Sequence, residues 1–304
     1  MKILITGGSG TIGKAFIKRH NKGNEFFVVG RNERLQTELI REFPNVKNKI
    51  GSIEDKSFLF RIFDDFRPDV VVHAAAMKHV NLAETNPVQA CQVNVMGSLN
   101  VIEASVRSNV PITISISTDK ACAPENVYGY TKSLMESCFL DANTDTNKFA
   151  VCRFANVTHS NGSVLPFWLD LKSKGEPLKL TDPNMNRLMF SKNDSADLVM
   201  ESIKLCNYGD GGFVLSKIMK SVNMLDLAKS ISDDIVITGK RPGEKVNETL
   251  INKDEVPFTY VRDDGYIMIK KEKNEYGNSI EHYYSSETAE KMNEKEIEIL
   301  IGDK

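Results

Sequence analysis

Residues that can move a proton stand close together near the middle of the chain. Tyr128 and Lys132 are four residues apart, so on a helix their side chains share one face. A neighbouring ammonium stabilises a tyrosinate and lowers the phenol pKa toward a range in which it can take a proton from an alcohol. The run Thr118-Asp119-Lys120 precedes them. After the fifth strand of a glycine-rich dinucleotide fold, the Tyr-x-x-x-Lys pair indicates hydride transfer at an alcohol carbon.

A glycine-rich turn near the start of the chain lies between a short apolar run and a helical pattern. Gly7, Gly10 and Gly13 have the spacing that permits a tight turn, the approach of a pyrophosphate and close packing of a helix on a strand. Amides at the start of that helix, including those of Thr11 and Ile12, would face the anion. The turn therefore predicts a dinucleotide site, and a plain glycine turn is the alternative.

The end of the second predicted strand indicates which dinucleotide binds. NAD sites usually have Asp or Glu there for the ribose 2′-hydroxyl, whereas an Arg suits a 2′-phosphate. The strand ends at Arg31 and has no acid, so NADP is favoured over NAD, unless Arg31 is only a solvated surface charge. The other residues expected at the cofactor are Ser52, Ile53, Ala74, Ala75, Ala76, Asn94, Tyr128 and Lys132.

These residues need a sheet to position them, and the first half of the chain predicts one. Strands are expected at Lys2–Thr6, Glu25–Val29, Lys49–Gly51, Asp69–His73, Pro111–Ser115 and Lys148–Arg153. Helices are expected at Thr11–His20, Lys56–Phe66, Val88–Ser108 and Val127–Leu140. The strands are apolar on both faces, as parallel strands covered by helices should be. The order predicts an α/β fold with a doubly wound parallel sheet of the Rossmann type.

After about Asn156 the pattern becomes less regular. Short strands are expected at Leu178–Leu180, Phe213–Ser216 and Asp234–Ile237, and helices after the N-cap candidates Ser191 or Asn193 and Ser221. We expect an NADP-binding domain over residues 1–156, with part of 190–216 packing back on it. A smaller C-terminal α/β substrate domain is expected over 157–304.

Composition excludes several classes of function. The chain has 304 residues, with 39 Lys and Arg against 41 Asp and Glu, so a nucleic-acid binder is not expected. Its five cysteines include no CxxC pair, and no metal site is expected. No apolar run is long enough for a membrane helix, so we expect a cytoplasmic protein with no membrane partner. His73 is expected to be a satisfied buried histidine rather than a ligand.

Several motifs, in the same order, resemble those of the extended short-chain dehydrogenase/reductases. The residues from Thr6 to Gly13 and the Tyr128-x-x-x-Lys132 pair carry the general resemblance. A narrower resemblance is to the polysaccharide-biosynthesis branch, which contains UDP-N-acetylglucosamine 4,6-dehydratases. It rests on the segments 73–80, 117–121, 126–129, 153–157, 162–166 and 241–245, and it extends from Lys2 to about Leu250.

The resemblance implies an NADP-dependent UDP-N-acetylglucosamine 4,6-dehydratase of the 5-inverting type, which makes a UDP-4-keto-6-deoxy sugar for surface glycan or nonulosonic acid synthesis. In that reaction Tyr128, helped by Lys132 and Thr118, takes the C4 hydroxyl proton. Lys120 is the base at C5, and Asp119 protonates the departing C6 hydroxyl. Thr-Asp-Lys is typical of the N-acetylglucosamine branch, whereas deoxyglucose-type dehydratases carry Thr-Asp-Glu. A retaining dehydratase, a UDP-sugar 4-epimerase and a non-catalytic NADP-binding sensor are the alternatives.

The resemblance also assigns residues to the UDP-sugar. Those expected at the substrate are Lys78, His79, Arg153, Asn156, Ser163, Val164, Thr181, Arg187, Arg241 and Glu244. The chain departs from the family pattern at Thr158-His159-Ser160, where Leu-Gly-Ser is expected, and at Phe154-Ala155, where Tyr-Gly is common. By analogy with the superfamily, the helices over 88–108 and 127–140 are expected to form the contact of a homo-oligomer, a dimer or larger.

Overall fold

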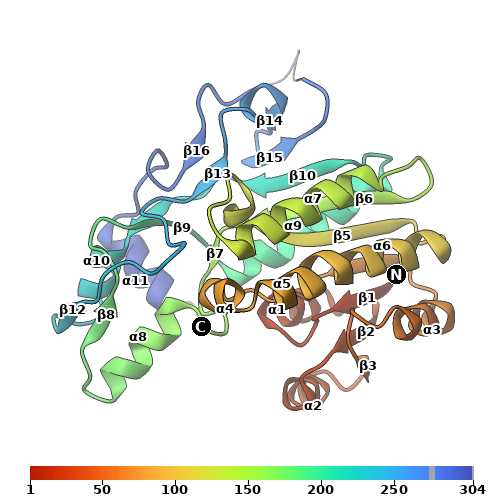
Figure 1. The fold of residues 1–304 in the computed structure, drawn as a ribbon, viewed down its shortest axis with the longest axis horizontal. Coiled ribbons are helices and arrows are strands. Elements are labelled where there is room, and N and C mark those ends of the chain that lie inside the picture. The colour runs from red at the N-terminus through yellow and green to blue at the C-terminus, as the bar shows by residue number, and fades with distance from the viewer. Residues whose placement is uncertain (274–277, 303–304) are drawn as a thin grey trace.

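A nine-stranded sheet is the centre of the molecule within residues 1–273 and 278–302, the part of the chain that this computed structural model describes (Figure 1). The strand order is β14-β15-β10-β6-β5-β4-β1-β2-β3. The strands are β1 (Lys2–Thr6), β2 (Glu25–Gly30), β3 (Lys47–Ile50), β4 (Val70–His73), β5 (Ile112–Thr118), β6 (Lys148–Phe154), β10 (Phe213–Lys217), β14 (Thr259–Val261) and β15 (Tyr266–Ile269).

The strands β3, β2, β1, β4, β5, β6 and β10 run parallel to one another. At the far edge, β15 and β14 are antiparallel to their neighbours. The order β3-β2-β1-β4-β5-β6 is that of a doubly wound sheet, whose ligands bind at the carboxyl ends of the strands. All four residues of β4 are buried, which explains why the central strands are apolar on both faces. The predicted Rossmann-type fold is confirmed.

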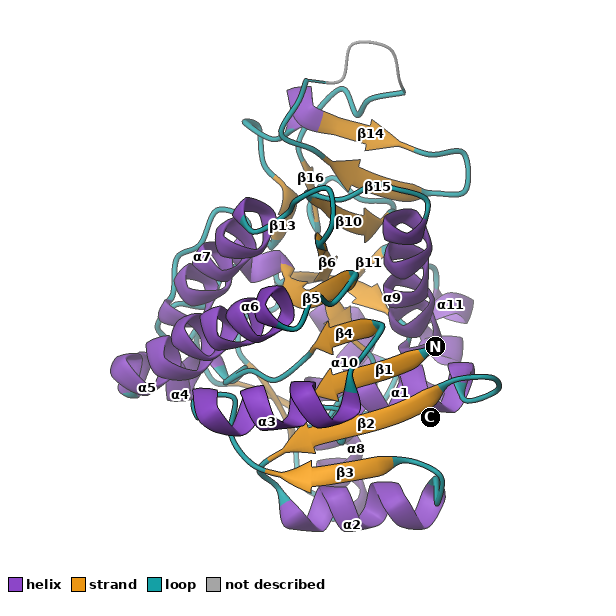
Figure 2. Cartoon of the chain, turned by 90° about the vertical axis from the view of Figure 1, so that its right-hand side faces the viewer, coloured by secondary structure: helices purple, strands orange, loops and turns teal. Residues whose placement is uncertain are grey.

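Helices cover both faces of this sheet. Figure 2 shows α3 (Lys56–Phe66), α6 (Gly97–Arg107) and α7 (Val127–Asp141) on one side, and α1 (Thr11–His20) and α9 (Lys192–Asn207) on the other. The remaining helix of this layer, α2 (Glu33–Glu42), lies beside β3 at the edge. Phe16 and Ile17 of α1 and Leu198 of α9 have no exposed surface, so the apolar stripes of these helices form the core against the sheet.

A second group of elements surrounds a separate apolar core that includes Trp168, Leu227 and Leu300. Two small sheets border it: one joins β7 (Asn156–Val157), β9 (Asn186–Phe190) and β11 (Ser221–Asn223), and the other joins β8 (Leu178–Leu180) and β12 (Ile235–Ile237). A third sheet, of β13 (Thr249–Ile251) and β16 (Tyr284–Ser285), packs against the main core instead. The helices of the second group are α8 (Val164–Ser173), α10 (Met224–Lys229) and α11 (Glu294–Gly302). The division at 156/157 stays a prediction, but α9, β10, β14 and β15 all lie on the main sheet.

Two local expectations were wrong. The single helix expected over 88–108 is α5 (Pro87–Cys91), a π-helical turn (Gln92–Met96) and α6, preceded by the short α4 (Val80–Thr85). Ser221 does not cap α10, because it is paired in β11; Asn223 caps the helix instead and accepts hydrogen bonds from the amides of Leu225 and Asp226. At α9 the expected cap Ser191 does accept a hydrogen bond from the Asp194 amide.

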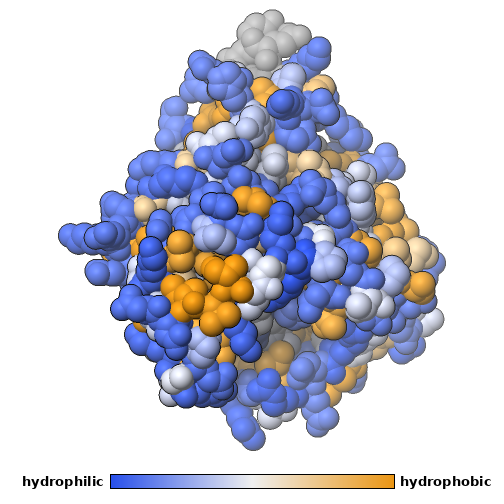
Figure 3. Space-filling view, turned by 60° about the vertical axis from the view of Figure 1, so that its left-hand side comes forward, coloured by the Kyte–Doolittle hydropathy of each residue, from blue (hydrophilic) through white to orange (hydrophobic). Residues whose placement is uncertain are grey.

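The described residues contain no helix that is both long and apolar enough to cross a membrane. The face shown in Figure 3 is mostly hydrophilic, and its apolar side chains gather mainly in one area.

Candidate active site

The glycine turn joins β1 to α1 at the carboxyl edge of the sheet. Gly7 has a φ of +71°, and a Cβ there would lie 2.7 Å from the backbone nitrogen of Ala75, so only glycine fits. The cap residue Gly10 has no side chain to accept hydrogen bonds from the first-turn amides of α1, which therefore remain available to an anion. The turn at Gly7 leaves no room for a Cβ, and it lies beside amides of α1 that no side chain caps. This arrangement fits the pyrophosphate of a dinucleotide.

Arg31 lies at the carboxyl end of β2, where its side chain is 59% exposed. Its guanidinium is 3.3 Å from a carboxylate oxygen of Glu54, which also accepts a hydrogen bond of 2.8 Å from the Ser52 hydroxyl. Arg31 and Ser52 therefore meet on one acidic partner. Ile53 is buried, and its carbonyl oxygen accepts a hydrogen bond from Asn100.

Asn94 was expected at the cofactor, but its side chain is used to hold the backbone. Its amide oxygen accepts a 2.7 Å hydrogen bond from the Met77 amide, and its nitrogen donates to the Met77 carbonyl and to the Thr131 hydroxyl, both at 3.0 Å. Asn94 lies in the π-helical turn that interrupts the helix between α5 and α6. It positions the segment after β4, which begins with Ala74, Ala75 and Ala76.

The predicted acid–base residues come together where β5 ends and α7 begins. The Thr118 hydroxyl donates a 2.8 Å hydrogen bond to Asp119, and the Lys120 ammonium donates one of 3.0 Å to the same oxygen. The Asn126 side chain caps α7 and accepts a hydrogen bond from the Gly129 amide, which places Tyr128 in the first turn. Burial raises the pKa of Tyr128 to about 12, and Lys120 and a hydrogen bond with Thr118 only partly oppose this.

Lys132 is buried in α7, and its ammonium is held by the backbone of β5. Its ammonium donates a 2.6 Å hydrogen bond to the carbonyl oxygen of Ile116. Burial lowers the pKa of Lys132 to about 8, with Glu136 opposing the shift. The cation that lowers the pKa of Tyr128 in this structure is Lys120. The spacing placed both side chains on one face of α7 but did not determine which charge lies at the phenol.

Sequence reasoning missed Glu248, which lies just before β13. Its carboxylate is 3.4 Å from the Lys120 ammonium, and only 2% of the residue is exposed. Burial raises the pKa of Glu248, and Lys120 opposes this shift. The carboxylates of Asp119 and Glu248 together hold the pKa of Lys120 above its ordinary value despite burial. The only sequence signal was an acid shortly after the 241–245 motif, and nothing in the pattern distinguished it from a surface carboxylate.

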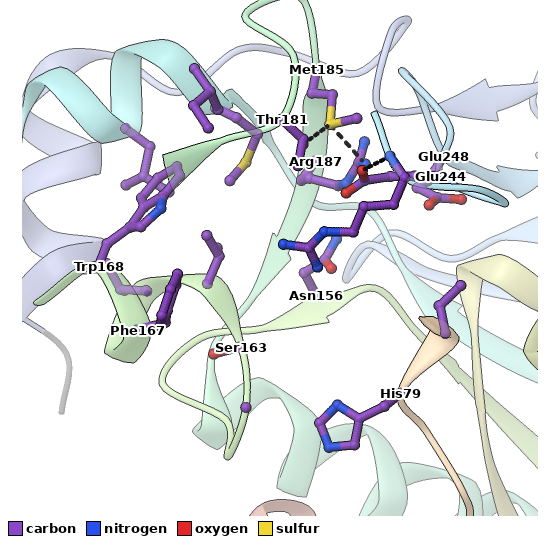
Figure 4. A pocket seen from close by; sticks show the side chains of 18 of the residues that line it. His79, Asn156, Ser163, Phe167, Trp168, Thr181, Met185, Arg187, Glu244 and Glu248 are labelled. Atoms are coloured by element: carbon purple, nitrogen blue, oxygen red, sulfur yellow. Dashed lines mark hydrogen bonds between the residues drawn. The ribbon is translucent and has the colours of Figure 1, made fainter. Parts of the chain in front are cut away.

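A cavity of about 550 Å³ extends from Lys120 and Glu248 to the second apolar core. Figure 4 shows Phe167 and Trp168 on one side of it and Glu244, Glu248 and His79 on the other. Nine of the ten residues expected at the substrate line it: Lys78, His79, Asn156, Ser163, Val164, Thr181, Arg187, Arg241 and Glu244. The sequence therefore placed nearly all of its predicted substrate residues on this wall, although their segments are far apart along the chain.

The cavity differs in character between its ends. Near Glu248, Arg187 is fixed by hydrogen bonds of 2.8 and 2.9 Å from its guanidinium to the carbonyl oxygens of Lys245 and Val246. The other end is apolar, with Met185, Met189, Met224, Leu227 and Leu300 among its lining residues. Trp168 is 1% exposed and donates its indole N–H to a backbone carbonyl, so it contributes to the core as well as to the cavity wall.

Arg153 is the exception among the residues expected at the substrate. It is 3% exposed and forms ion pairs of 2.6 Å with Glu136 and 2.8 Å with Glu255. A further hydrogen bond goes from its guanidinium to the carbonyl oxygen of Leu250. These contacts lie at a second cavity, behind the segment that follows Lys120. The structure does not place Arg153 on the wall of the first cavity, because the buried Glu136 and the half-buried Glu255 hold its guanidinium at the second one, and its contact with the substrate stays a prediction.

The loop that departs from the family pattern, at residues 158–161, lies between the glycine turn and the cavity. His159 has a φ of +49°, the left-handed conformation that suits the glycine expected there. The Asn161 amide donates a 3.1 Å hydrogen bond to the Thr11 hydroxyl, and Lys78 donates one of 2.6 Å to the Asn161 carbonyl. The loop therefore connects the glycine turn to the cavity, and Thr11 contacts it through its hydroxyl.

Comparison with known proteins assigns the chain to a family. A family model described as polysaccharide biosynthesis protein matches residues 3–270. The chain belongs to this family. The match confirms the resemblance to the extended short-chain dehydrogenase/reductases and to their polysaccharide-biosynthesis branch.

The chain is also similar to individual named proteins. It is 37% identical to the UDP-N-acetylglucosamine 4,6-dehydratase (inverting) of Campylobacter jejuni, over 88% of this chain and 82% of that protein. It is 32% identical to a UDP-glucose 4-epimerase of Rickettsia massiliae, over 84% of this chain and 78% of that protein. The crystal structure of Pen from Bacillus thuringiensis covers 99% of this chain and 96% of its own, with a TM-score of 0.91 and 28% identity.

Proposed function

We propose that this polysaccharide biosynthesis family member is an NADP-dependent UDP-N-acetylglucosamine 4,6-dehydratase of the 5-inverting type. The observation that carries the proposal is the cavity that opens on Lys120, which is paired with Asp119, because an elimination needs a base and an acid beside the sugar. A relative with this activity in its name is similar over most of the chain. The product would be a UDP-4-keto-6-deoxy sugar for surface glycan or nonulosonic acid synthesis.

The cavity suits a nucleoside diphosphate sugar. Arg187, Arg241 and Lys78 line it, and cations of this kind bind a diphosphate. Its apolar end, with Phe167 and the methionines, can accept the flat face of a base. The sugar would then lie next to Lys120, at the opposite end of the cavity from the nucleobase.

NADP is proposed as the cofactor, held by the glycine turn and by Arg31. When bound, NADP would accept a hydride from C4 of the sugar and return it at C6, so no net oxidation results. Arg31 is exposed and paired with only one carboxylate at 3.3 Å, so it can turn to a 2′-phosphate. Glu54 is the residue that would favour NAD instead, if it accepted a ribose hydroxyl.

The chain's own residues provide the proton transfers. Tyr128 takes the C4 hydroxyl proton; the resulting ketone acidifies the C5–H bond, whose proton passes to Lys120. Asp119 enters this step as the carboxylic acid and gives its proton to the C6 oxygen, which leaves as water. Tyr128 enters as the phenolate, so the proton that it gains balances the one lost by Asp119 and returns to Asp119 before the next turnover. Inversion follows if Lys120 returns its proton to the opposite face of C5.

The decisive experiment is incubation of the purified protein with UDP-N-acetylglucosamine in deuterated water, followed by NMR of the product. We expect loss of water, deuterium at C5 and couplings of the L-arabino configuration. Retained D-configuration at C5 would indicate the retaining dehydratase. Bound NADP with no reaction of the sugar would indicate the non-catalytic sensor.

The second candidate is a UDP-sugar 4-epimerase, which the similarity to proteins of that name favours. An epimerase needs Tyr128 but no base at C5. The variant Lys120→Ala separates the two, because it would stop elimination and leave epimerisation intact. A C4 epimer formed without loss of water would reject the dehydratase.

We also propose that the protein is a homo-oligomer through the outer surface of α5, α6 and α7. Large apolar side chains are exposed there: Val88 is 69%, Tyr130 58% and Leu134 52% exposed. Light scattering after size-exclusion chromatography tests this, and Leu134→Glu is expected to give the monomer. A wild-type monomer at all concentrations would contradict it.

A further inference from the structure

Lys120 raises a problem for the proposed reaction, on which this inference rests. A base at C5 must be a neutral amine, but Lys120 lies between two buried carboxylates, Asp119 at 3.0 Å and Glu248 at 3.4 Å. In that arrangement it is an ammonium, which is an acid. Its proton must therefore leave before Lys120 can accept another.

Two features of the pair of carboxylates point to where that proton goes. Asp119 is fully buried and Glu248 is 2% exposed, and each has one carboxylate oxygen with no hydrogen-bond partner among the described residues. Asp119, Glu248 and Lys120 together carry one excess negative charge, with the cation of Arg187 nearby, and a proton on the unpartnered oxygen of Asp119, as its role as the acid requires, would neutralise the three. The Asp119 oxygen nearest Lys120 already accepts hydrogen bonds from Thr118 and Lys120, whereas within the described part of the chain only the Lys120 side chain is paired with Glu248.

We propose that Glu248 is a third acid–base group of this site, which exchanges a proton with Lys120. An N–H bond of the ammonium breaks, an O–H bond forms on Glu248, and the ion pair becomes a neutral amine and a carboxylic acid. The amine then takes the C5 proton, and the electron pair of the C5–H bond moves toward the C4 ketone. When Lys120 has returned a proton to C5, Glu248 gives its proton back, so the pair ends as it began.

The charges around Glu248 suit this exchange. Burial and Asp119 raise the pKa of its carboxyl, whereas Lys120, Arg187 and Lys245 act in the opposite direction. Its main chain is fixed on both sides by Ser286, whose hydroxyl accepts from the Glu248 amide and whose amide donates to the Glu248 carbonyl. Glu248 acts on the sugar only through Lys120, so it needs a position close to the ammonium and no contact with the substrate.

The variant Glu248→Gln tests the proposal, because glutamine keeps the shape but cannot accept the proton. We expect kcat for formation of the keto sugar to fall about 100-fold while KM changes less than about threefold. The isotope effect of substrate deuterated at C5 should rise, and Glu248→Asp should recover part of the rate. The matched control is Glu255→Gln, which removes another, half-buried carboxylate and should leave the isotope effect at its wild-type value.

A second measurement is independent of the reaction: the pH dependence of Lys120 acetylation, followed by mass spectrometry in wild type and Glu248→Gln. We expect the titration of Lys120 to move to lower pH in the variant. An unchanged titration rejects the exchange even if the protein has a different substrate. If wild type makes the keto sugar but Glu248→Gln has the same kcat and isotope effect, the inference is wrong and the proposed function stands. If wild type makes no keto sugar, the function is wrong, and the titration alone decides the exchange.

Discussion

His73 at the end of β4 is held as a neutral, fully hydrogen-bonded imidazole. Its Nδ1 lies 2.7 Å from the Thr6 hydroxyl and its Nε2 lies 2.9 Å from the Ser98 hydroxyl. Ser98 donates its only proton to the carbonyl oxygen of Asn94 at 2.6 Å, so it accepts from Nε2–H, and Nδ1 accepts from Thr6. Protonation of His73 would therefore disrupt this network as well as bury a charge.

Burial, with the charge of Lys132, lowers the pKa of His73 from 6.5 to about 3. Between these two values the unfolded chain binds a proton that the native protein does not, so stability falls as the pH falls. Each pH unit well inside this window is worth about 1.4 kcal/mol. Between pH 7.5 and pH 4.5 the His73 contribution amounts to a loss of about 2.6 kcal/mol.

The assay is urea unfolding of wild type and His73→Gln at both pH values, because other groups that titrate in this range cancel in the difference. The stability advantage of wild type over the variant is expected to shrink by about 2.6 kcal/mol on acidification. The exposed His282, changed to Gln, is the matched control and should show no such change. A difference between wild type and His73→Gln that is constant within about 0.5 kcal/mol would refute the reasoning.

Three further outcomes are expected. Tyr128→Phe should lower kcat by about 100-fold to 10,000-fold, measured as keto-sugar formation, with UDP binding intact by calorimetry. Arg153→Met should cost about 3–5 kcal/mol in urea unfolding, because the buried Glu136 and the half-buried Glu255 lose their cation, and should leave KM unchanged. Arg31→Ala should weaken NADP binding about tenfold and leave NAD binding unchanged in fluorescence titrations. An equal loss of affinity for NADP and NAD would contradict a contact between Arg31 and the 2′-phosphate.

The sheet could be predicted because its signals are local. The structure has β1 and α1 at the predicted bounds, and the tight turn that the glycine spacing predicted is present, with Gly7 at a positive φ against the backbone of Ala75. A parallel strand is apolar on both faces and a glycine turn must follow it, so both leave a pattern within a few residues. Nine of the ten residues that the resemblance assigned to the substrate line the cavity, because they stand in short motifs.

The misses share a different cause. Arg153 was expected at the substrate, but Glu136 and Glu255, which are distant in sequence, hold its guanidinium elsewhere. Ser221 satisfied the sequence rule for a cap but was paired in β11. In both cases a partner from a distant segment determined the environment of the side chain, and no local pattern encodes that partner.

The sequence by itself determined the fold class and the glycine turn, and it predicted that Thr118, Asp119, Lys120 and Tyr128 lie together, because each of these depends on neighbours along the chain. Only the tertiary structure decided which charges meet. It brought Glu248 from a distant segment to Lys120, whose charge lowers the pKa of Tyr128 against the effect of burial. Interactions between charges depend on distance in space and on burial, and both are set only when the chain has folded.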